Sequence, residues 1–461
     1  MKNSSQTKPD VRSECLHILR EVEEKEVFAQ ELISSRCAKD DISKVDKHLL
    51  TELVNGIIRH RLSLDTIISF FSKIPLNKIE PWVRQALRMG LYQMIYLDRI
   101  PASAAVNTSV ELIKKLVHRT DAARYTNAIL RSVERDIHNK CLPNKEIADP
   151  RKALYRREGT WCTFHSPLFP HPEKHPLTSL AINYSHPEWL VKRWLHRYGK
   201  EKAIEICKAN NLAPKVYLRI NHAKISPQEF RELLNKNSIH SNFTGNAIVV
   251  ENNAISEIPG FSEGLFFVQD VSAMKVAQFL KTEPANTVLD MCAAPGGKTT
   301  HIAELLRKTG KIYALDVSLK RLLLVKENCL RMGVSNVFPV CGDASEHRVP
   351  FQCAFDRVLI DAPCSNTGVF SRRAEARWRL KEEDIYKISA LQYSILKTGA
   401  TSLQPNGFLV YSTCSIEPEE NQNVIKKFLG NEPQFCLDAE EYYLPGKAGD
   451  GGYMARLCRK S

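Results

Sequence analysis

Two cysteines of the chain stand where a nucleophile could act on a bound ligand. Cys364 lies in the segment DAPCS and Cys414 in the segment STCS, and each follows a short apolar run. Such runs predict buried parallel strands, and the ligands of an open sheet bind beyond the carboxyl ends of its strands. A cysteine there is either a small buried apolar group, which is the usual case, or a thiolate nucleophile. Two cysteines on the same rim favour the nucleophile.

A loop of small residues earlier in the chain predicts a ligand-binding turn. The apolar run 287–290 leads into MCAAPGGKT, which lets the backbone approach a ligand closely and presents the amides of a following helix. Its last residues, GKT, are shared with phosphate-binding P-loops, but Cys292 stands where that motif has its first glycine. The dinucleotide motif GxGxxG is absent from the sequence as well. The candidate ligand-binding residues of the loop are Cys292, Ala293, Ala294, Pro295, Gly296, Gly297 and Lys298.

Aspartates at successive strand ends extend this candidate site. Asp290 ends the first predicted strand of the sheet, Asp316 ends the second, and Asp343 lies in GDAS after the third. A carboxylate at the end of the second strand can accept hydrogen bonds from both hydroxyls of a ribose. One such aspartate is more often a helix cap, but three in successive loops favour a nucleoside-type ligand.

Three regions of different pattern would position these residues. Residues 11–136 carry apolar side chains at helical spacing in consecutive segments, which predicts an all-helical domain. Helical and strand-like stretches mix over 183–270, which predicts a small α+β subdomain. Strands alternate with helices over 271–461, which predicts a doubly wound α/β sheet of parallel strands. We therefore expect a multidomain chain with domains at 1–140, 183–270 and 271–461.

The segment between the first two domains, 141–182, is rich in proline. Proline at this density disfavours both helices and central strands, so we expect a linker or an insertion. His171 and His175 in this segment could hold a metal ion, but no regular element would fix them, and a solvated loop is the better interpretation. We expect no metal site.

The net charge indicates the class of partner, and the cysteine content indicates the cellular compartment. The 461 residues carry a formal net charge of +13, which favours an anionic partner, nucleic acid first, although a merely basic enzyme is the alternative. The excess is spread over the regions and does not form a basic tail. The chain has 13 cysteines without the short spacings of zinc sites, and it shows no signal peptide or long apolar stretch. We expect a cytoplasmic protein, away from membranes, that buries most of its cysteines in the core.

The motifs together resemble those of a known enzyme family. The segments DMCAAPGGKTTHIAELL, ALDVS, GDAS, LIDAPCSNTGVF and YSTCSIEPEEN resemble, in order and spacing, the motifs of S-adenosylmethionine-dependent RNA cytosine-5 methyltransferases. The resemblance extends over 184–461. The helical residues 11–136, with VNTSVELIKKL and YTNAILR, resemble the NusB-like domain of the bacterial subgroup that acts on 16S ribosomal RNA, the Sun or Fmu type. The resemblance implies an all-α NusB-like RNA-binding domain, a small α+β subdomain and a Rossmann-like methyltransferase domain.

The resemblance also implies a cofactor and roles for the two cysteines. S-adenosylmethionine would be held by the loop 292–298 together with Asp316, Asp343 and Asp361. Cys414 would add to C6 of a cytosine in 16S ribosomal RNA, which makes C5 nucleophilic, and Cys364 would assist release of the product.

Access to the base completes the mechanism that the resemblance implies. Asp361 could bond the ring N3 or the exocyclic amine of the base, in addition to its cofactor role. Because a stacked base is inaccessible, the RNA would be single-stranded or its cytosine flipped. We expect the enzyme to act as a monomer.

Two local features depart from the family pattern. Asn366 stands where glycine is common after Cys-Ser, and RRAE at 372–375 replaces a segment that usually carries a proline. The basic residues in and after this segment could grip RNA phosphates or form a solvated helical face, and the sequence leaves both open. These residues are Arg372, Arg373, Arg377, Arg379 and Lys381.

Other functions are compatible with parts of the sequence. A cytosine-5 methyltransferase of transfer RNA or of large-subunit RNA would share every motif after residue 184, and the helical N-terminal domain argues against it. A non-catalytic RNA-binding or antitermination factor would share the NusB-like helices. The intact pair Cys364 and Cys414 and the unbroken loop 290–299 argue against such a factor.

Overall fold

A computed structural model describes residues 10–25, 27–38, 42–244, 247–250, 255–307, 309–346, 351, 354–446 and 449–461. The chain forms two compact units. The first unit extends to Leu212 and also holds Arg373–Arg379. The second unit holds Ala213–Arg372 and Leu380–Ser461. In the described part of the chain, no helix is both long and apolar enough to cross a membrane.

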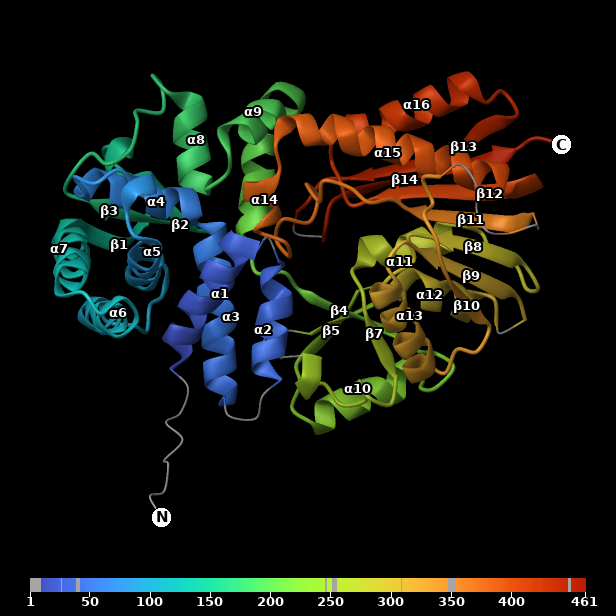
Figure 1. The fold of residues 1–461 in the computed structure, drawn as a ribbon, viewed down its shortest axis with the longest axis horizontal. Coiled ribbons are helices and arrows are strands. Elements are labelled where there is room, and N and C mark those ends of the chain that lie inside the picture. Colours follow the sequence, from blue (N-terminus) through green and yellow to red (C-terminus); the bar gives the residue numbers. More distant parts are fainter. Residues whose placement is uncertain are drawn as a thin grey trace, which may run out of the picture. The chain divides into compact units, whose positions relative to one another are not determined.

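Amphipathic helices make up most of the first unit (Figure 1). They are α1 (Val11–Lys25), α2 (Ala29–Cys37), α3 (Lys44–Arg59), α4 (Arg61–Phe71), α5 (Pro81–Tyr96), α6 (Ala102–Val117), α7 (Thr120–Asp136), α8 (Pro176–Tyr184) and α9 (Glu188–Asn211). Helix α5 contacts α1, α3, α4, α6 and α7 and is buried over most of its length. Its residues Val83, Leu87 and Leu91 face this core, as their helical spacing predicts. The all-helical domain is confirmed.

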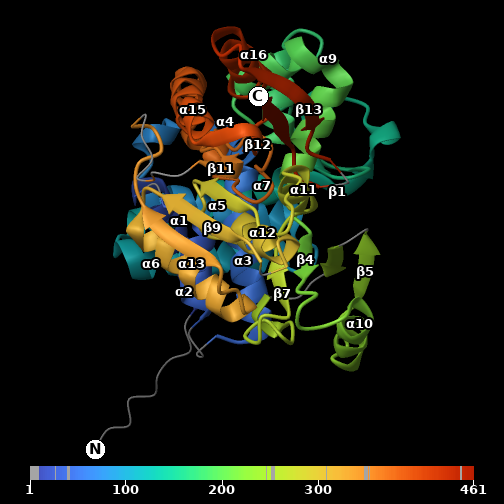
Figure 2. The ribbon, with the colours of Figure 1, turned by 90° about the vertical axis from the view of Figure 1, so that its right-hand side faces the viewer.

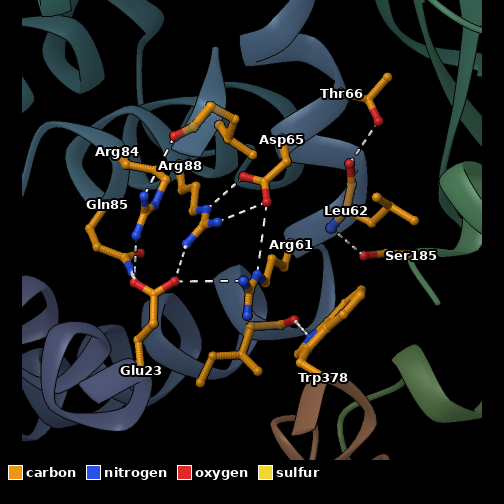
Figure 3. Close-up of polar contacts among 12 residues, drawn as sticks. Glu23, Arg61, Leu62, Asp65, Thr66, Arg84, Gln85, Arg88, Ser185 and Trp378 are labelled. Atoms are coloured by element: carbon orange, nitrogen blue, oxygen red, sulfur yellow. Dashed lines mark hydrogen bonds and ion pairs between the residues drawn. The ribbon is translucent and has the colours of Figure 1, made fainter. Parts of the chain in front are cut away.

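A buried network of charges joins three of these helices (Figure 3). Arg88 of α5 donates to both carboxylate oxygens of Asp65 on α4, over 2.6 and 2.8 Å. Glu23 of α1 accepts from Arg84 and from Gln85, over 3.1 and 2.9 Å. Burial would raise the pKa of Glu23, but the surrounding arginines lower it, so the carboxylate stays charged. Because each charge has a partner, the network orients α1, α4 and α5 instead of destabilising the core.

The proline-rich segment contains a small sheet. Strands β1 (Ile137–Pro143), β2 (Ala153–Arg157) and β3 (Thr160–Phe164) form an antiparallel sheet in the order β1-β3-β2. The expectation that 141–182 lacks regular structure is therefore wrong. Pro143 ends the edge strand β1, and Pro176 occupies the first turn of α8. Proline is tolerated at both positions because neither requires its N–H group.

A segment from the second half of the sequence belongs to the first unit. It contains the short helix α14 (Ala376–Arg379). The Arg377 side chain is fully buried and donates to the backbone oxygens of Ser185 and Asn210. Arg379 donates to the backbone oxygens of Val22 and Val27. Both guanidinium groups donate their hydrogen bonds to backbone oxygens of the first unit. Neither arginine therefore binds RNA phosphates or belongs to a solvated helical face.

Trp378, between these two arginines, also packs in the first unit (Figure 3). Its indole N–H donates to the backbone oxygen of Ile58 over 2.8 Å. The guanidinium of Arg61 lies 5.6 Å from its ring centroid, which is a cation–π distance. The segment Arg373–Arg379 is therefore packed into the first unit by these contacts.

The second unit begins with a four-stranded antiparallel sheet. Its elements are β4 (Val216–Ile220), α10 (Pro227–Lys236), β5 (Ser241–Thr244), β6 (Ala247–Val250) and β7 (Phe266–Val268), with strand order β5-β6-β4-β7. Helix α10 lies beside this sheet (Figure 2). Phe230 and Leu234 of α10 share a core with Leu218 and Ile248 of the sheet. This is the predicted α+β arrangement.

A seven-stranded sheet forms the rest of the second unit, in the order β10-β9-β8-β11-β12-β14-β13. Its strands are β8 (Thr287–Met291), β9 (Lys311–Asp316), β10 (Val337–Cys341), β11 (Phe355–Asp361), β12 (Leu403–Thr413), β13 (Phe435–Tyr443) and β14 (Gly452–Arg459). The first five are parallel, as predicted. Strands β14 and β13, which the sequence pattern did not predict, extend the sheet and pair antiparallel to their neighbours.

Helices cover both faces of this sheet (Figure 1). They are α11 (Val271–Phe279), α12 (Gly297–Leu305), α13 (Leu319–Met332), α15 (Glu382–Thr401) and α16 (Gln422–Asn431). Val288 and Leu359 pack on the face of α11 and α12, while Leu289 and Ile360 pack on the face of α15. Because both of its faces are covered, the central strands of the sheet are mostly apolar, which made them visible in the sequence.

Candidate functional site

The two candidate cysteines meet at the carboxyl ends of neighbouring strands. Asp361 at the end of β11 pairs with Ser412 near the end of β12. Cys364 and Cys414 follow a few residues later, and their Sγ atoms lie 2.8 Å apart. The sequence predicts that they share a rim, and the pairing of β11 with β12 brings the two sulfur atoms into contact.

Asn366 shapes the loop that carries Cys364. Its φ is 62°, in the left-handed region that asparagine and glycine adopt more readily than other residues. Its side-chain amide donates to the backbone oxygen of Cys364 over 3.0 Å, and the thiol of Cys414 donates to its Oδ1 over 3.4 Å. Asparagine thus keeps the backbone geometry that glycine would supply, and its side chain contacts both cysteine-bearing loops.

A buried carboxylate joins the residues that follow the two cysteines. Glu420 is fully buried and accepts from the backbone N–H of Ser365 over 2.9 Å and from the hydroxyl of Ser415 over 2.7 Å. The Ser365 hydroxyl and the side-chain amide of Gln392 donate to it as well. Burial raises the pKa of Glu420, and these hydrogen bonds oppose that rise. Sequence reasoning missed this residue, because its segment EPEEN shows no sign of which glutamate is buried.

Replacing Glu420 by alanine is expected to lower the free energy of unfolding by about 2–4 kcal/mol, because Ser365 and Ser415 lose a buried charged acceptor. Chemical denaturation followed by tryptophan fluorescence measures this. The control is Glu441→Ala on β13, where the side chain is exposed and a change within about 0.5 kcal/mol is expected. Equal stability of the two variants would show that Glu420 does not hold the loops together.

One cavity brings three of the predicted residues together. Lys298, Asp361 and Cys414 line a cavity of about 50 Å³ at this rim. The Lys298 ammonium donates to Asp361 Oδ2 over 2.7 Å. Ser272 of α11 and Tyr443 of β13 line the same cavity and were not singled out by the sequence. They come from elements far apart in the chain, so no local motif contains them.

The Lys298 side chain and the Cys364 thiol both lie close to Cys414. Burial would lower the pKa of Lys298, but Asp361 and, less strongly, Cys414 raise it, so the group is a cation. The pKa of Cys364 is raised by its hydrogen bond to Cys414 and then by burial. A thiolate at Cys414 would therefore lie beside an ammonium group and beside a neutral thiol that donates a hydrogen bond. Both interactions stabilise a thiolate, the reactive form of cysteine.

A hydrogen bond holds the predicted ligand-binding loop, residues 292–298, to the end of β9. Asp316 is buried, and its carboxylate accepts from the backbone N–H groups of Ala294 and Ser318, over 3.1 and 3.0 Å. Cys292 and Gly296 have φ values of 61° and 99°, which turn the chain sharply before α12. A Cβ on Gly296 would also come within 3.2 Å of the Val325 backbone. Backbone conformation and close packing thus both require glycine at Gly296.

Acidic side chains lie around the Cys292 end of this loop. Burial raises the pKa of the Cys292 thiol, and Asp361, Asp316 and Asp290 raise it further. Asp343 is exposed, and one of its oxygens accepts from the backbone N–H and the hydroxyl of Ser345, both over 2.7 Å. Carboxylates converging on a small-residue loop suit a ligand that carries positive charge.

Asp290 lies beneath this loop and is fully buried. Thr299 donates to its Oδ2 over 2.6 Å, while its Oδ1 is buried without a hydrogen-bond partner. Burial raises the pKa of Asp290 to about 7, against the opposing effect of the Thr299 hydrogen bond. The folded protein therefore holds a proton on this carboxyl at pH values where an exposed aspartate is charged.

Replacement of Asp290 by asparagine is expected to change how stability depends on pH. The unfolded carboxyl has a pKa of about 3.9. Between pH 4 and 7 the folded state therefore binds more protons, and wild-type stability falls as pH rises through this window. The variant lacks this loss, so its stability relative to wild type should rise by up to about 4 kcal/mol from pH 4 to 7. Urea unfolding at several pH values, with exposed Glu383→Gln as control, measures this, and parallel curves would contradict it.

Arg219 of β4 supports the start of α12 and was missed by sequence reasoning. Its guanidinium donates to the backbone oxygen of Gly297 over 2.8 Å and to the hydroxyl of Thr300 over 2.9 Å. It also pairs with Glu304 over 3.1 Å. No local pattern marks Arg219, because its partners lie about 80 residues later in the chain.

The other cysteines are less buried than the sequence predicts. Of the twelve cysteines in the described residues, all free, four are buried, so the expectation that most lie in the core is wrong. The buried ones are Cys15, Cys162, Cys207 and Cys329. Several of the others lie on strands of the mixed sheet, where the side chains of edge positions reach solvent.

Family comparisons agree with the three structural regions. Residues 277–453 match the family described as 16S rRNA methyltransferase RsmB/F, and residues 9–135 match the NusB family. Residues 186–255 match the ferredoxin-like domain of RsmF/B-like methyltransferases.

Individual proteins match over nearly the whole chain. A probable ribosomal RNA small subunit methyltransferase B of Bacillus subtilis is 35% identical over 445 residues, which cover 95% of this chain and 93% of that protein. Ribosomal RNA small subunit methyltransferase B of Klebsiella pneumoniae is 34% identical over 435 residues, covering 91% of each. The crystal structure of a methyltransferase homolog protein from Pyrococcus horikoshii has 30% identity and a TM-score of 0.54, and the match covers 62% of this chain and 99% of that one.

Proposed function

Because the chain belongs to the ribosomal RNA small subunit methyltransferase B family of S-adenosylmethionine-dependent cytosine-5 methyltransferases, we propose that it methylates C5 of a cytosine in 16S ribosomal RNA through a covalent bond from Cys414. One observation carries the covalent mechanism. The Sγ atoms of Cys364 and Cys414 lie 2.8 Å apart, and Cys414 shares a cavity with Lys298 and Asp361. Two thiols, a cation and a carboxylate thus lie close together, which supports a nucleophilic role for Cys414.

The proposed reaction begins at C6 of the base. Cytosine C5 is a poor nucleophile, but addition of the Cys414 thiolate to C6 breaks the C5–C6 double bond and gives C5 nucleophilic character. When bound, S-adenosylmethionine supplies an electrophilic methyl group on a sulfonium. After C5 is methylated, a base removes its proton, the electron pair restores the C5–C6 double bond, and the Cys414 thiolate leaves C6.

The neighbouring residues have distinct roles in this proposal. Lys298 stabilises the thiolate of Cys414 before attack, which follows from its positive charge in the same cavity. Asp361 bonds the ring N3 or the exocyclic amine of the base. Cys364 contacts the sulfur that becomes bonded to C6, and its thiol can donate a proton to that sulfur as it leaves, which assists release of the product.

We propose that the cofactor binds at the pinned loop Cys292–Lys298, with Asp316, Asp343 and Asp361. The chemistry of these residues fits the group, because S-adenosylmethionine carries a sulfonium and an ammonium, and the loop is surrounded by carboxylates. Small side chains leave the backbone of the loop accessible. Asp316 orders the loop through Ala294 and would face the ribose with the remaining lone pairs of its carboxylate.

Methylation of unmodified 16S ribosomal RNA tests the proposal. Incubation with labelled S-adenosylmethionine should label a cytosine, and bisulfite sequencing of RNA from a deletion strain should show which position loses its methyl group. Label in transfer RNA or 23S RNA alone would overturn the proposed substrate. No binding of S-adenosylmethionine in an equilibrium titration would instead favour a non-catalytic RNA-binding factor. The monomeric state and the cytoplasmic location stay predictions.

A further inference from the structure

A second and larger cavity lies in the second unit, away from the two cysteines. Its volume is about 470 Å³, and it is enclosed by the turn after β4, by α11 and α12, and by residues from the end of α13 to the start of β10. Neither cysteine, nor Lys298, nor Asp361 lines it. A cavity of this size falls in the range that holds small ligands in proteins. The proposed reaction does not use it.

Besides Arg219 Nε, buried polar atoms of His301 and Asn336 in its wall lack hydrogen-bond partners. His301 of α12 is 6% exposed, and its Nδ1 has no partner. Asn336 donates from Nδ2 to the backbone oxygen of Gly310 over 3.0 Å, but its Oδ1 is buried without a partner. Burial lowers the pKa of His301 to about 3, so the ring is neutral and carries one donor and one acceptor. Buried polar groups without partners are unfavourable, and here both line a cavity that a ligand could fill.

The rest of the lining is apolar at its centre and polar at its opening. Met274, Met332 and Leu305 are among its apolar lining residues, while His222 and Arg307 are exposed side chains of the lining. A flat body with hydrogen-bonding edges would satisfy the two polar groups and contact the methionine side chains. The exposed Arg307 guanidinium suits a phosphate attached to that body. This combination describes a nucleotide.

We propose that this cavity binds a base of the RNA substrate close to the target cytosine, which rests on the function proposed above. The two cavities share their walls. In α11, Ala273 and Val276 line the cavity at the cysteines, while Met274 and Gln278 line the larger one. In α12, Lys298 lines the first and Glu304 the second, and six residues of helix span about 9 Å. The separation along α12 is a distance that a few nucleotides of one RNA strand can span.

Two substitutions in the full chain test this inference. Ala223→Trp places a large ring at an exposed position of the opening, and His301→Leu removes a polar group without a partner. Each should weaken binding of labelled single-stranded 16S RNA fragments about tenfold in fluorescence anisotropy, which is a typical effect of losing one base contact. The loss should persist at high salt, because it does not involve phosphates. The control is Ala390→Trp, exposed on α15 on the other face of the sheet, with wild-type affinity expected.

Stability separates a binding role of His301 from a packing role. If its only role is packing, His301→Leu leaves RNA affinity unchanged, and that result would overturn the proposal. If it contacts a base, the variant keeps or raises the melting temperature, because a buried unpaired group is gone, while RNA affinity falls. Ala223→Trp gives an independent measurement at an exposed site, where misfolding is not expected.

The outcomes distinguish this inference from the proposed function. Wild-type protein that methylates RNA, with Ala223→Trp and His301→Leu binding RNA equally well, would overturn the cavity proposal and leave the function intact. Wild-type protein that neither binds nor methylates RNA would overturn the function. Titration with the four nucleoside monophosphates identifies the source of the base. Monophosphate binding that Ala223→Trp abolishes, with unchanged RNA affinity, would mean that free nucleotides occupy the cavity and would overturn the RNA assignment.

Discussion

Cys414→Ala protein is expected to transfer no measurable methyl group to RNA, with a fall in kcat of at least about a thousandfold. Without the sulfur, nothing adds to C6 of the base, and C5 stays a poor nucleophile. Neighbouring groups cannot replace it, because Lys298 is a cation paired with Asp361, and burial still raises the pKa of Cys364 when the hydrogen bond to Cys414 is gone. Single-turnover transfer from labelled S-adenosylmethionine to 16S RNA measures the effect.

Two controls make this result specific. Cys436→Ala removes an exposed thiol on β13 and should leave the rate unchanged. Equilibrium titration should show that the Cys414→Ala protein binds S-adenosylmethionine as tightly as wild type, since Cys414 is outside the proposed cofactor loop. A Cys414→Ala protein that methylates RNA at the wild-type rate would rule out the covalent mechanism at this residue.

Cys364→Ala protein is expected to trap RNA in a covalent complex. Attack by Cys414 and methylation at C5 need only the first thiol, but departure of the Cys414 sulfur from the product uses the second. Multiple-turnover methylation should therefore fall by about a hundredfold or more, as for the loss of a general acid, while one equivalent of methyl group is still transferred. Denaturing gel electrophoresis should show an RNA–protein band that contains the label.

The double variant Cys364→Ala, Cys414→Ala is the matched control for this band. It should form no complex, because the bond to RNA is made by Cys414. Free RNA in the gel with the single Cys364→Ala variant, together with wild-type turnover, would remove the release role of Cys364. A complex in the double variant would place the bond on another residue.

Much of the fold was visible in the sequence because its elements carry regular apolar patterns. The helices of the first unit bury one face each, and the central strands of the second unit are buried on both faces. Elements with weaker patterns were missed. Strand β13 is largely exposed and resembles a loop in composition, and the small sheet β1-β3-β2 lies among prolines that occupy its ends and edges.

The candidate site was partly predictable for the same reason. Cys364, Cys414 and the loop 292–298 follow apolar strands directly, so their place on the rim is a local property of the chain. Glu420 and Arg219 act through hydrogen bonds to residues about 55 and 80 positions away, and no local pattern marks such partners. Arg377 shows the opposite error, since an arginine that looks like a surface cation is buried against backbone oxygens.

The sequence alone determined the helices of the first unit, the order of the parallel strands and the helices between them, the residues that follow these strands, and the family motifs that distinguish two cysteines among 13. Only the tertiary structure decided that Cys364 and Cys414 are in contact, that Glu420 joins their loops, and that a second cavity shares α11 and α12 with the first. The physical reason is that the apolar pattern of a helix or strand depends only on residues that are close together in the sequence. Contacts between loops depend instead on strand register, and register is decided by the packing of the whole sheet.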